Sequence, residues 1–168
     1  MNSQDNQADA VGEQALETFL EEGGTFAMLK GVSKADLEQL YSLAFNHYQS
    51  GNWDEAHTLF KGLCVLSHYD PRFFLGLGAC RQSLGLFDQA LQSYTYGALI
   101  DLNDPRFPFH AGECHFQLGD WEAAESGFYS AGVLASTQPQ FSGLGQSAGV
   151  MLEAVLGKRG QENVSSHA

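Results

Sequence analysis

The residues best suited to chemistry are three cysteines and six histidines, which could supply metal ligands or a reactive thiol. The densest group is Glu113-Cys114-His115, preceded by His110. Successive residues on a helix point about 100° apart, so these three neighbours cannot converge on one ion. The chain has no Cys-x-x-Cys pair, and its odd cysteine count argues against a disulfide framework. We therefore expect no metal site.

A second pattern suggests a cofactor loop. The stretch from Gly143 to Ala148 has Gly-x-Gly-x-x-Ala spacing, which superficially resembles a dinucleotide-binding fingerprint. That fingerprint requires a preceding strand and a βαβ unit, and the surrounding sequence indicates neither. The sequence therefore predicts a protein that is not an enzyme and that uses no cofactor.

An internal repeat of 34 residues explains the cysteines better. Cys80 and Cys114 are 34 residues apart, so they occupy the same place in successive units, where a free cysteine behaves as a small apolar residue. Four further classes recur at this spacing: Gly51, Gly85 and Gly119; Trp53, Phe87 and Trp121; Ala56, Ala90 and Ala124; Phe60, Tyr94 and Phe128. Pro71-Arg72-Phe73-Phe74 likewise returns as Pro105-Arg106-Phe107-Pro108. This period is the length of a tetratricopeptide repeat, a helix–turn–helix unit that must stack on its neighbours.

Each recurring class has a structural role. The glycine ends the first helix of a unit, where a left-handed backbone costs it little. Asn52 and Asp120 can cap the second helix through their side-chain oxygens. The aromatic residue two places after the glycine packs into the hairpin, and the alanine lies where the helices cross. Pro71, Pro105 and Pro139 stand at the joints between units.

We therefore predict an all-α protein with three tetratricopeptide repeats, at 37–70, 71–104 and 105–138. The expected first helices are 37–49, 71–84 and 105–118, and the second helices are 53–66, 87–100 and 121–134. A helical segment at 11–36, broken at Gly23-Gly24, precedes the repeats, and a capping helix at 139–157 covers the last one. Residues 1–10 and 158–168 are polar and aperiodic, so we expect disorder there.

The formal net charge is −12, from 8 basic and 20 acidic residues. This balance argues against binding to nucleic acid or to anionic membrane surfaces. No apolar run approaches the roughly 18 residues that a membrane span needs, and the polar start lacks a signal sequence. We expect a cytoplasmic protein without stable membrane association. The charge would either keep an apolar client in solution or simply form a solvated surface.

Six apolar residues give the N-terminal segment a possible interface. Two interpretations remain open: the segment caps the first repeat, or it pairs with a second copy of the chain. The residues expected at a dimer contact are Leu16, Phe19, Leu20, Phe26, Met28 and Leu29.

The first helices of stacked repeats line a concave groove. Their second, fifth, ninth and twelfth positions are Glu38, Tyr41, Phe45 and Tyr48; Arg72, Leu75, Ala79 and Gln82; and Arg106, Phe109, Glu113 and Phe116. Leu66 and His68 are placed to complete the wall. The groove is mostly apolar, with arginine only at its entrance, which favours an extended ligand with apolar anchors. Alternatively, some of these aromatic residues fill the core or contact the N-terminal segment.

Several stretches together resemble the class II chaperones of bacterial type III secretion systems, across residues 13–157. The matching stretches are Gly23-Gly24-Thr25-Phe26-Ala27-Met28-Leu29, 37–46, His68-Tyr69-Asp70, 72–82, Pro105-Arg106-Phe107-Pro108-Phe109-His110-Ala111, Ala124-Glu125-Ser126-Gly127 and Met151-Leu152-Glu153-Ala154. Gly112 departs from the resemblance, because relatives tend to have alanine there.

The resemblance implies a chaperone for two hydrophobic, pore-forming translocator proteins, bound one at a time. A short N-terminal segment of the client would occupy the groove, keeping the client soluble, separate from the other client and competent for export. Tyr41, Phe45 and Tyr48 are then the foremost groove residues. The resemblance also implies a homodimer when free, and a role of some members in gene regulation. The alternative is a general repeat scaffold or a regulatory adaptor for a folded partner.

Overall fold

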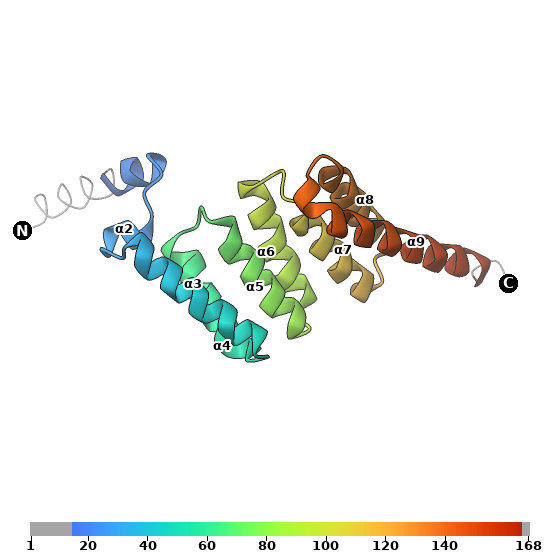
Figure 1. Ribbon diagram of the computed structural model, residues 1–168, viewed down its shortest axis with the longest axis horizontal. Coiled ribbons are helices and arrows are strands. Elements are labelled where there is room, and N and C mark those ends of the chain that lie inside the picture. The colour runs from blue at the N-terminus through green and yellow to red at the C-terminus, as the bar shows by residue number, and fades with distance from the viewer. Residues whose placement is uncertain (1–14, 166–168) are drawn as a thin grey trace, which may run out of the picture.

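The computed structural model describes residues 15–165 of the 168-residue chain, and these form helices joined by short turns, without a strand. Three helix pairs follow one another: α3 (Lys34–Gln49) and α4 (Trp53–Leu66), α5 (Pro71–Ser83) and α6 (Phe87–Ile100), and α7 (Arg106–Leu118) and α8 (Trp121–Ser136). Figure 1 shows the pairs side by side in one elongated row, with α2 at one end and α9 at the other. The all-α repeat fold is therefore confirmed.

Glycine turns join the helices within each pair, as predicted. Gly51, Gly85 and Gly119 have φ angles of 78°, 75° and 76°, a left-handed conformation that glycine adopts without a Cβ penalty. The prediction of caps is confirmed only for Asp120, whose Oδ1 accepts the Ala123 N–H at 3.1 Å. Asn52 makes no side-chain cap hydrogen bond, so that prediction was wrong.

The first helix begins three residues earlier than predicted, at Lys34. Ser33 and Asp36 form a reciprocal capping box: Asp36 N–H donates to Ser33 Oγ at 3.1 Å, and Ser33 N–H donates to Asp36 Oδ2 at 2.9 Å. Each side chain satisfies a backbone donor that the first helical turn leaves free. The repeat length alone places the start of this helix at residue 37, because it does not take the capping box into account.

The helices pack closely because small residues recur at their crossings. Ala56, Ala90 and Ala124 are fully buried. Cys80 and Cys114 are buried too, and burial raises the pKa of both thiols to about 12, so they are packing residues as predicted. The aromatic residues that recur in the second helix of each repeat are at most 1% exposed: Phe60, Tyr94 and Phe128. The hairpin aromatics are less uniform, because Trp121 packs edge-to-face on Phe116 whereas Trp53 is 40% exposed.

Two short helices precede the repeats. Residues 15–21 are helical, Gly23 turns the chain with φ 84°, and α2 (Phe26–Leu29) follows, so the predicted break at Gly23-Gly24 is confirmed. A Cβ on Gly24 would lie 2.3 Å from the Phe19 ring, so this ring packs directly against the turn between the two short helices. The predicted disorder of 1–10 lies outside the described residues.

A short 3₁₀ turn, η1 (Pro139–Phe141), leads into the long helix α9 (Ser142–Ser165). Ala148 and Val155 are buried, and α9 packs on α8 as the predicted cap. The predicted disorder from residue 158 was wrong as far as Ser165, since the helix continues and Arg159 forms an ion pair with Glu125 on α8. None of the described helices is both long enough and apolar enough to cross a membrane.

Candidate functional site

The first helices of the three pairs form one continuous surface. Helix α3 contacts α5, and α5 contacts α7. We call this surface, made by α3, α5 and α7, the inner face. The residues predicted for a groove lie on these helices, apart from Leu66 and His68 at the end of the first pair. The face therefore brings side chains that are far apart in the sequence onto one surface.

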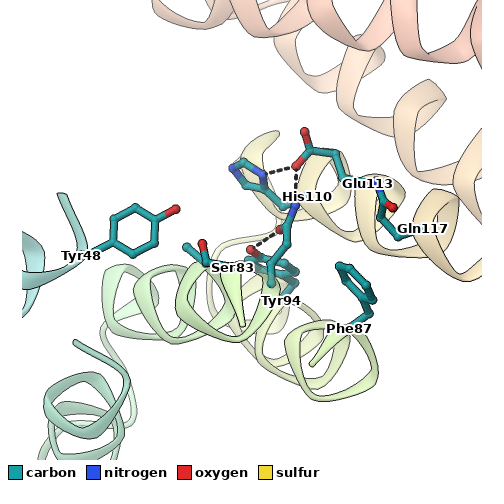
Figure 2. Close-up of a pocket in the computed structure, with 9 residues that line it drawn as sticks. Tyr48, Ser83, Phe87, Tyr94, His110, Glu113 and Gln117 are labelled. Atoms are coloured by element: carbon teal, nitrogen blue, oxygen red, sulfur yellow. Dashed lines mark hydrogen bonds and ion pairs between the residues drawn. The ribbon is translucent and has the colours of Figure 1, made fainter. Parts of the chain in front are cut away.

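An open pocket of about 510 Å³ lies at the middle of the inner face. We call it the central pocket (Figure 2). It brings together four of the predicted groove residues: Tyr48, Ala79, Gln82 and Glu113. It also contains residues that the sequence analysis did not place there: Ser83, Phe87, Tyr94, His110 and Gln117. Two of these come from α6, since the second helix of the middle repeat closes one side of the pocket.

A hydrogen-bonded network orders the polar side chains of the central pocket. Tyr94 Oη donates to Gln82 Oε1 at 2.8 Å, and Gln82 Nε2 donates to Glu113 Oε2 at 2.9 Å. His110 Nδ1 lies 2.8 Å from the same Glu113 oxygen. The rings of Tyr94 and His110 stack with their centroids 5.5 Å apart, so each member of the network is held by at least one other.

The network favours an ionised Glu113. Partial burial on its own would raise the pKa of this carboxyl, but hydrogen bonds from His110 and Gln82 outweigh burial and lower it. Burial also raises the pKa of the Tyr94 hydroxyl, which therefore remains a donor. The pocket thus combines a negative carboxylate with aromatic walls.

Toward the N-terminal end, aromatic side chains dominate the inner face. The Tyr41 ring packs edge-to-face on the buried Phe60 with centroids 5.9 Å apart, and lies 6.3 Å from the Phe45 ring. Phe45 is 43% exposed. Tyr41 therefore connects the core to the surface, while the Phe45 ring remains exposed on α3.

The arginines at the entrance are already paired with carboxylates. Arg72 Nη2 lies 2.6 Å from Glu38 Oε1 and 2.7 Å from Asp70 Oδ2, and its guanidinium stacks over the Tyr41 ring at 5.0 Å. Arg106 makes the equivalent pair with Asp104 at 2.6 Å. Both arginines therefore hold the turns between repeats together, and their charge is largely compensated before any ligand arrives.

The remaining predicted groove residues have mixed environments. Phe109 is only 8% exposed and packs edge-to-face on Phe128, so the structure places it in the core between α7 and α8, and the groove assignment of this residue was wrong. Leu75 is partly buried and packs against the core of the middle repeat. His68 lies outside the central pocket with its ring tilted against Tyr69, the centroids 4.1 Å apart, and Leu66 is partly buried.

The residues predicted for dimerisation form an apolar surface on the N-terminal segment. Five are at least 42% exposed, whereas Phe19 is half-buried against Gly24: the exposed five are Leu16, Leu20, Phe26, Met28 and Leu29. A single chain therefore leaves this surface in contact with water, which is typical of an interaction site.

The glycine-rich stretch near the C-terminus forms no catalytic or cofactor loop. Gly143 to Ala148 lies within α9, so the dinucleotide-like spacing has no strand before it. Gly145-Gln146-Ser147-Ala148-Gly149 also fits the Gly-x-Ser-x-Gly pattern of serine hydrolases. That pattern needs a strained strand-to-helix turn. Here Ser147 Oγ donates to Gly143 O at 3.1 Å inside the helix, as an ordinary helical serine does.

Known proteins share this arrangement. The family model described as tetratricopeptide repeat matches residues 37–70. Low calcium response locus protein H of Yersinia pseudotuberculosis is 54% identical over 149 residues, which cover 89% of both chains. Among solved structures, a type III secretion system complex from Aeromonas hydrophila matches with a TM-score of 0.85 at 59% identity, covering 87% of this chain and 97% of the other.

A second similar structure is a complex with a bound segment of another protein. PcrH, known from Pseudomonas aeruginosa and here in complex with the chaperone-binding region of PopD, matches with a TM-score of 0.76. It is 64% identical, and the match covers 77% of this chain and 97% of that one. Identity of this extent, together with the repeat fold and the inner face, shows that the chain belongs to the non-enzymatic translocator chaperones of type III secretion systems.

Proposed function

We propose that this protein is a cytoplasmic bacterial chaperone that binds two hydrophobic, pore-forming translocators through its inner face. Binding would keep each client soluble, separate from the other and competent for export. The observation that carries the proposal is an aromatic inner face with an open pocket. The chain that has it is 64% identical to PcrH, whose structure contains the chaperone-binding region of PopD. PcrH also forms a complex with the chaperone-binding region of PopB, and SycD of Yersinia enterocolitica with a peptide of YopD.

The inner face suits an extended segment of a client. Phe45 and Tyr48 lie one helical turn apart on α3, and their rings offer apolar area at small cost in side-chain entropy. Ala79 on α5 leaves room for a client side chain in the central pocket. The ligand would thus bury its apolar residues against α3 and α5, at roughly 25 cal/mol for each Å² removed from water.

The function can be tested by co-expression with the two translocators of the same secretion locus. We expect both translocators to stay soluble and protected from proteolysis only when the chaperone is present. Phe45→Ala should weaken this protection, whereas Leu99→Ala should not, because Leu99 is 70% exposed but lies on α6, away from the inner face. Translocators that aggregate equally with and without the chaperone would refute the proposal.

We also propose that the free protein is a homodimer through the exposed apolar residues of the N-terminal segment. The double change Met28→Asp and Leu29→Asp places two charges on that surface, where both side chains are more than half exposed, so the fold should persist. Light scattering should then give the mass of a single chain. The matched control is Leu102→Asp, at a 72% exposed leucine far along the row of repeats. A wild type that is monomeric at every concentration would refute the dimer.

A further inference from the structure

One acidic side chain, Glu113, lies in the lining of the central pocket. Among the described residues that line it, Glu113 is the only carboxylate, and there is no lysine or arginine. The repeat pattern does not require an acid here, because the equivalent positions in the first two repeats are Phe45 and Ala79. The carboxylate is therefore a feature of the third repeat alone.

The two oxygens of this carboxylate differ in their surroundings. Oε2 accepts a hydrogen bond from Gln82 Nε2 at 2.9 Å and lies 2.8 Å from His110 Nδ1. A carboxylate only accepts, so the Nδ1 of His110 carries the proton in this contact. Figure 2 shows the other oxygen turned away from both hydrogen bonds, and no described residue bonds to Oε1. The network thus fixes the carboxylate through Oε2 and leaves Oε1 without a hydrogen bond from the described residues.

A client segment lying over the central pocket would remove water from this oxygen. An apolar side chain there would leave a charged oxygen unpaired, which is costly, whereas an N–H donor with positive charge would form a strong, charge-assisted bond. Phe87 and Tyr94 provide aromatic walls for the methylene groups of a long side chain, and Tyr48 faces the opening from α3. The net charge of −12 also favours the approach of a basic group.

We propose that the central pocket receives a lysine or arginine side chain of the client segment, whose charged end bonds to Glu113 Oε1. The pocket would then select clients by one basic residue in addition to apolar anchors. A backbone N–H is a poorer occupant, because it would leave much of the roughly 510 Å³ unfilled. This inference rests on the proposed function and deepens it.

The test uses the chaperone-binding region of PopD as the probe peptide. Each position is replaced in turn by lysine, by norleucine or by Nε-acetyl-lysine, and affinities are measured by fluorescence anisotropy. We expect one position at which lysine binds about tenfold more tightly than norleucine, the usual scale for a hydrogen bond to a charged group. Nε-acetyl-lysine, which keeps the stem and loses the charge, should bind there as weakly as norleucine.

The protein variants connect that preference to one carboxylate. In Glu113→Gln the lysine preference should fall to less than about twofold, while the shape of the side chain and its bonds to Gln82 and His110 can persist. The control Glu153→Gln makes the same charge change at an exposed site on α9 and should keep the preference.

The outcomes separate this inference from the proposed function. If PopD peptides bind but no position prefers lysine, or if Glu113→Gln retains the preference, the basic-residue pocket is refuted and the chaperone function stands. If no PopD peptide binds the wild type, the basic-residue pocket is refuted, whereas the chaperone function is refuted only if the translocators of the same locus aggregate equally with and without the protein. Because the comparison of lysine with Nε-acetyl-lysine uses only wild-type protein, a poorly folded variant would not weaken the test.

Discussion

Helices α7 and α8 pack closely at Gly127, so the structure predicts whether an added methyl group stabilises or destabilises the fold there. A Cβ added to Gly127 on α8 would lie 2.8 Å from the carbonyl oxygen of Pro108 and 2.9 Å from Cα of Gly112. Both are backbone atoms of α7, so they cannot rotate away as a side chain could. Gly132, one and a half turns further along α8, has open space around its Cβ direction. Gly127→Ala and Gly132→Ala therefore add the same methyl group to the same helix in opposite surroundings.

The expected magnitudes follow from two opposing contributions. Replacing glycine by alanine inside a helix stabilises it by up to about 1 kcal/mol. At Gly132 nothing opposes this gain. At Gly127 forced overpacking costs about 2–3 kcal/mol, near the upper end of its usual range, because backbone must shift. We expect Gly127→Ala to lower the free energy of unfolding by about 1–2 kcal/mol and Gly132→Ala to raise it by about 1 kcal/mol.

Thermal unfolding followed by circular dichroism can distinguish the two. For a domain of this size, 1 kcal/mol corresponds to about 2–4 °C in Tm. Gly127→Ala should thus lower Tm by about 2–8 °C, and Gly132→Ala should raise it by about 2–4 °C. Protein concentration must be the same throughout, because a dimer makes Tm concentration-dependent. An increase in Tm for Gly127→Ala equal to that for Gly132→Ala would show that the α7–α8 contact is not as close as described.

Three further predictions concern the inner face. Tyr94→Phe removes the hydrogen bond to Gln82 and should lower the free energy of unfolding by about 0.5–1.5 kcal/mol in urea titrations; an unchanged value would mean that the hydroxyl is not engaged. Phe45→Ala should weaken binding of the PopD peptide by about 5–30-fold in calorimetry with Tm nearly unchanged, because the ring is 43% exposed, and a large drop in Tm would instead indicate a core role. The lowered pKa of Glu113 means that its ionised form contributes stability above the ordinary pKa near 4.5, and that this contribution is lost as the pH falls below it. Acid unfolding of Glu113→Gln should therefore be less steep below pH 4.5 than that of the wild type.

The sequence was sufficient to predict the helices because residues that end a helix or allow two helices to cross recur in every repeat. Glycine at the end of each first helix and alanine at each crossing recur with the period, and the observed helices begin and end within a few residues of the predicted limits. Errors arose where a local interaction overrides the period. The capping box at Ser33 extends α3, and the ion pair between Arg159 and Glu125 accompanies an α9 that continues through a polar stretch.

The site was harder to predict, because a periodic rule assigns positions and not neighbours. The rule that placed Glu113 and Gln82 on the inner face also placed Phe109 there, although its ring fills the core against Phe128. The period groups Tyr94 with Phe60 and Phe128, and the structure buries all three, yet the Tyr94 hydroxyl reaches Gln82 at the pocket. Only the packed structure shows which side chains meet.

At Gly112 the sequence alone is likewise insufficient to predict the effect of a substitution on stability. From helix propensity alone, glycine here weakens α7 by up to about 1 kcal/mol relative to alanine. The structure adds an opposing contribution, because a Cβ on Gly112 would lie 3.0 Å from the Phe128 ring and because Gly127 of α8 packs directly on the Gly112 backbone. The pair of glycines therefore allows α7 and α8 to approach closely, so alanine at position 112 gains less than propensity predicts.

The polar network of the central pocket appears where the three repeats differ. The buried aromatic position is phenylalanine in the first and third repeats, and only Tyr94 in the second carries a hydroxyl. The partner position holds Tyr48 and Phe116 in the outer repeats and Gln82 in the middle one. One hydroxyl and one amide, both in the middle repeat, thus connect the core to the carboxylate of Glu113. The period accounts for the stacking of the helices, whereas the departures from it give the inner face its chemical selectivity.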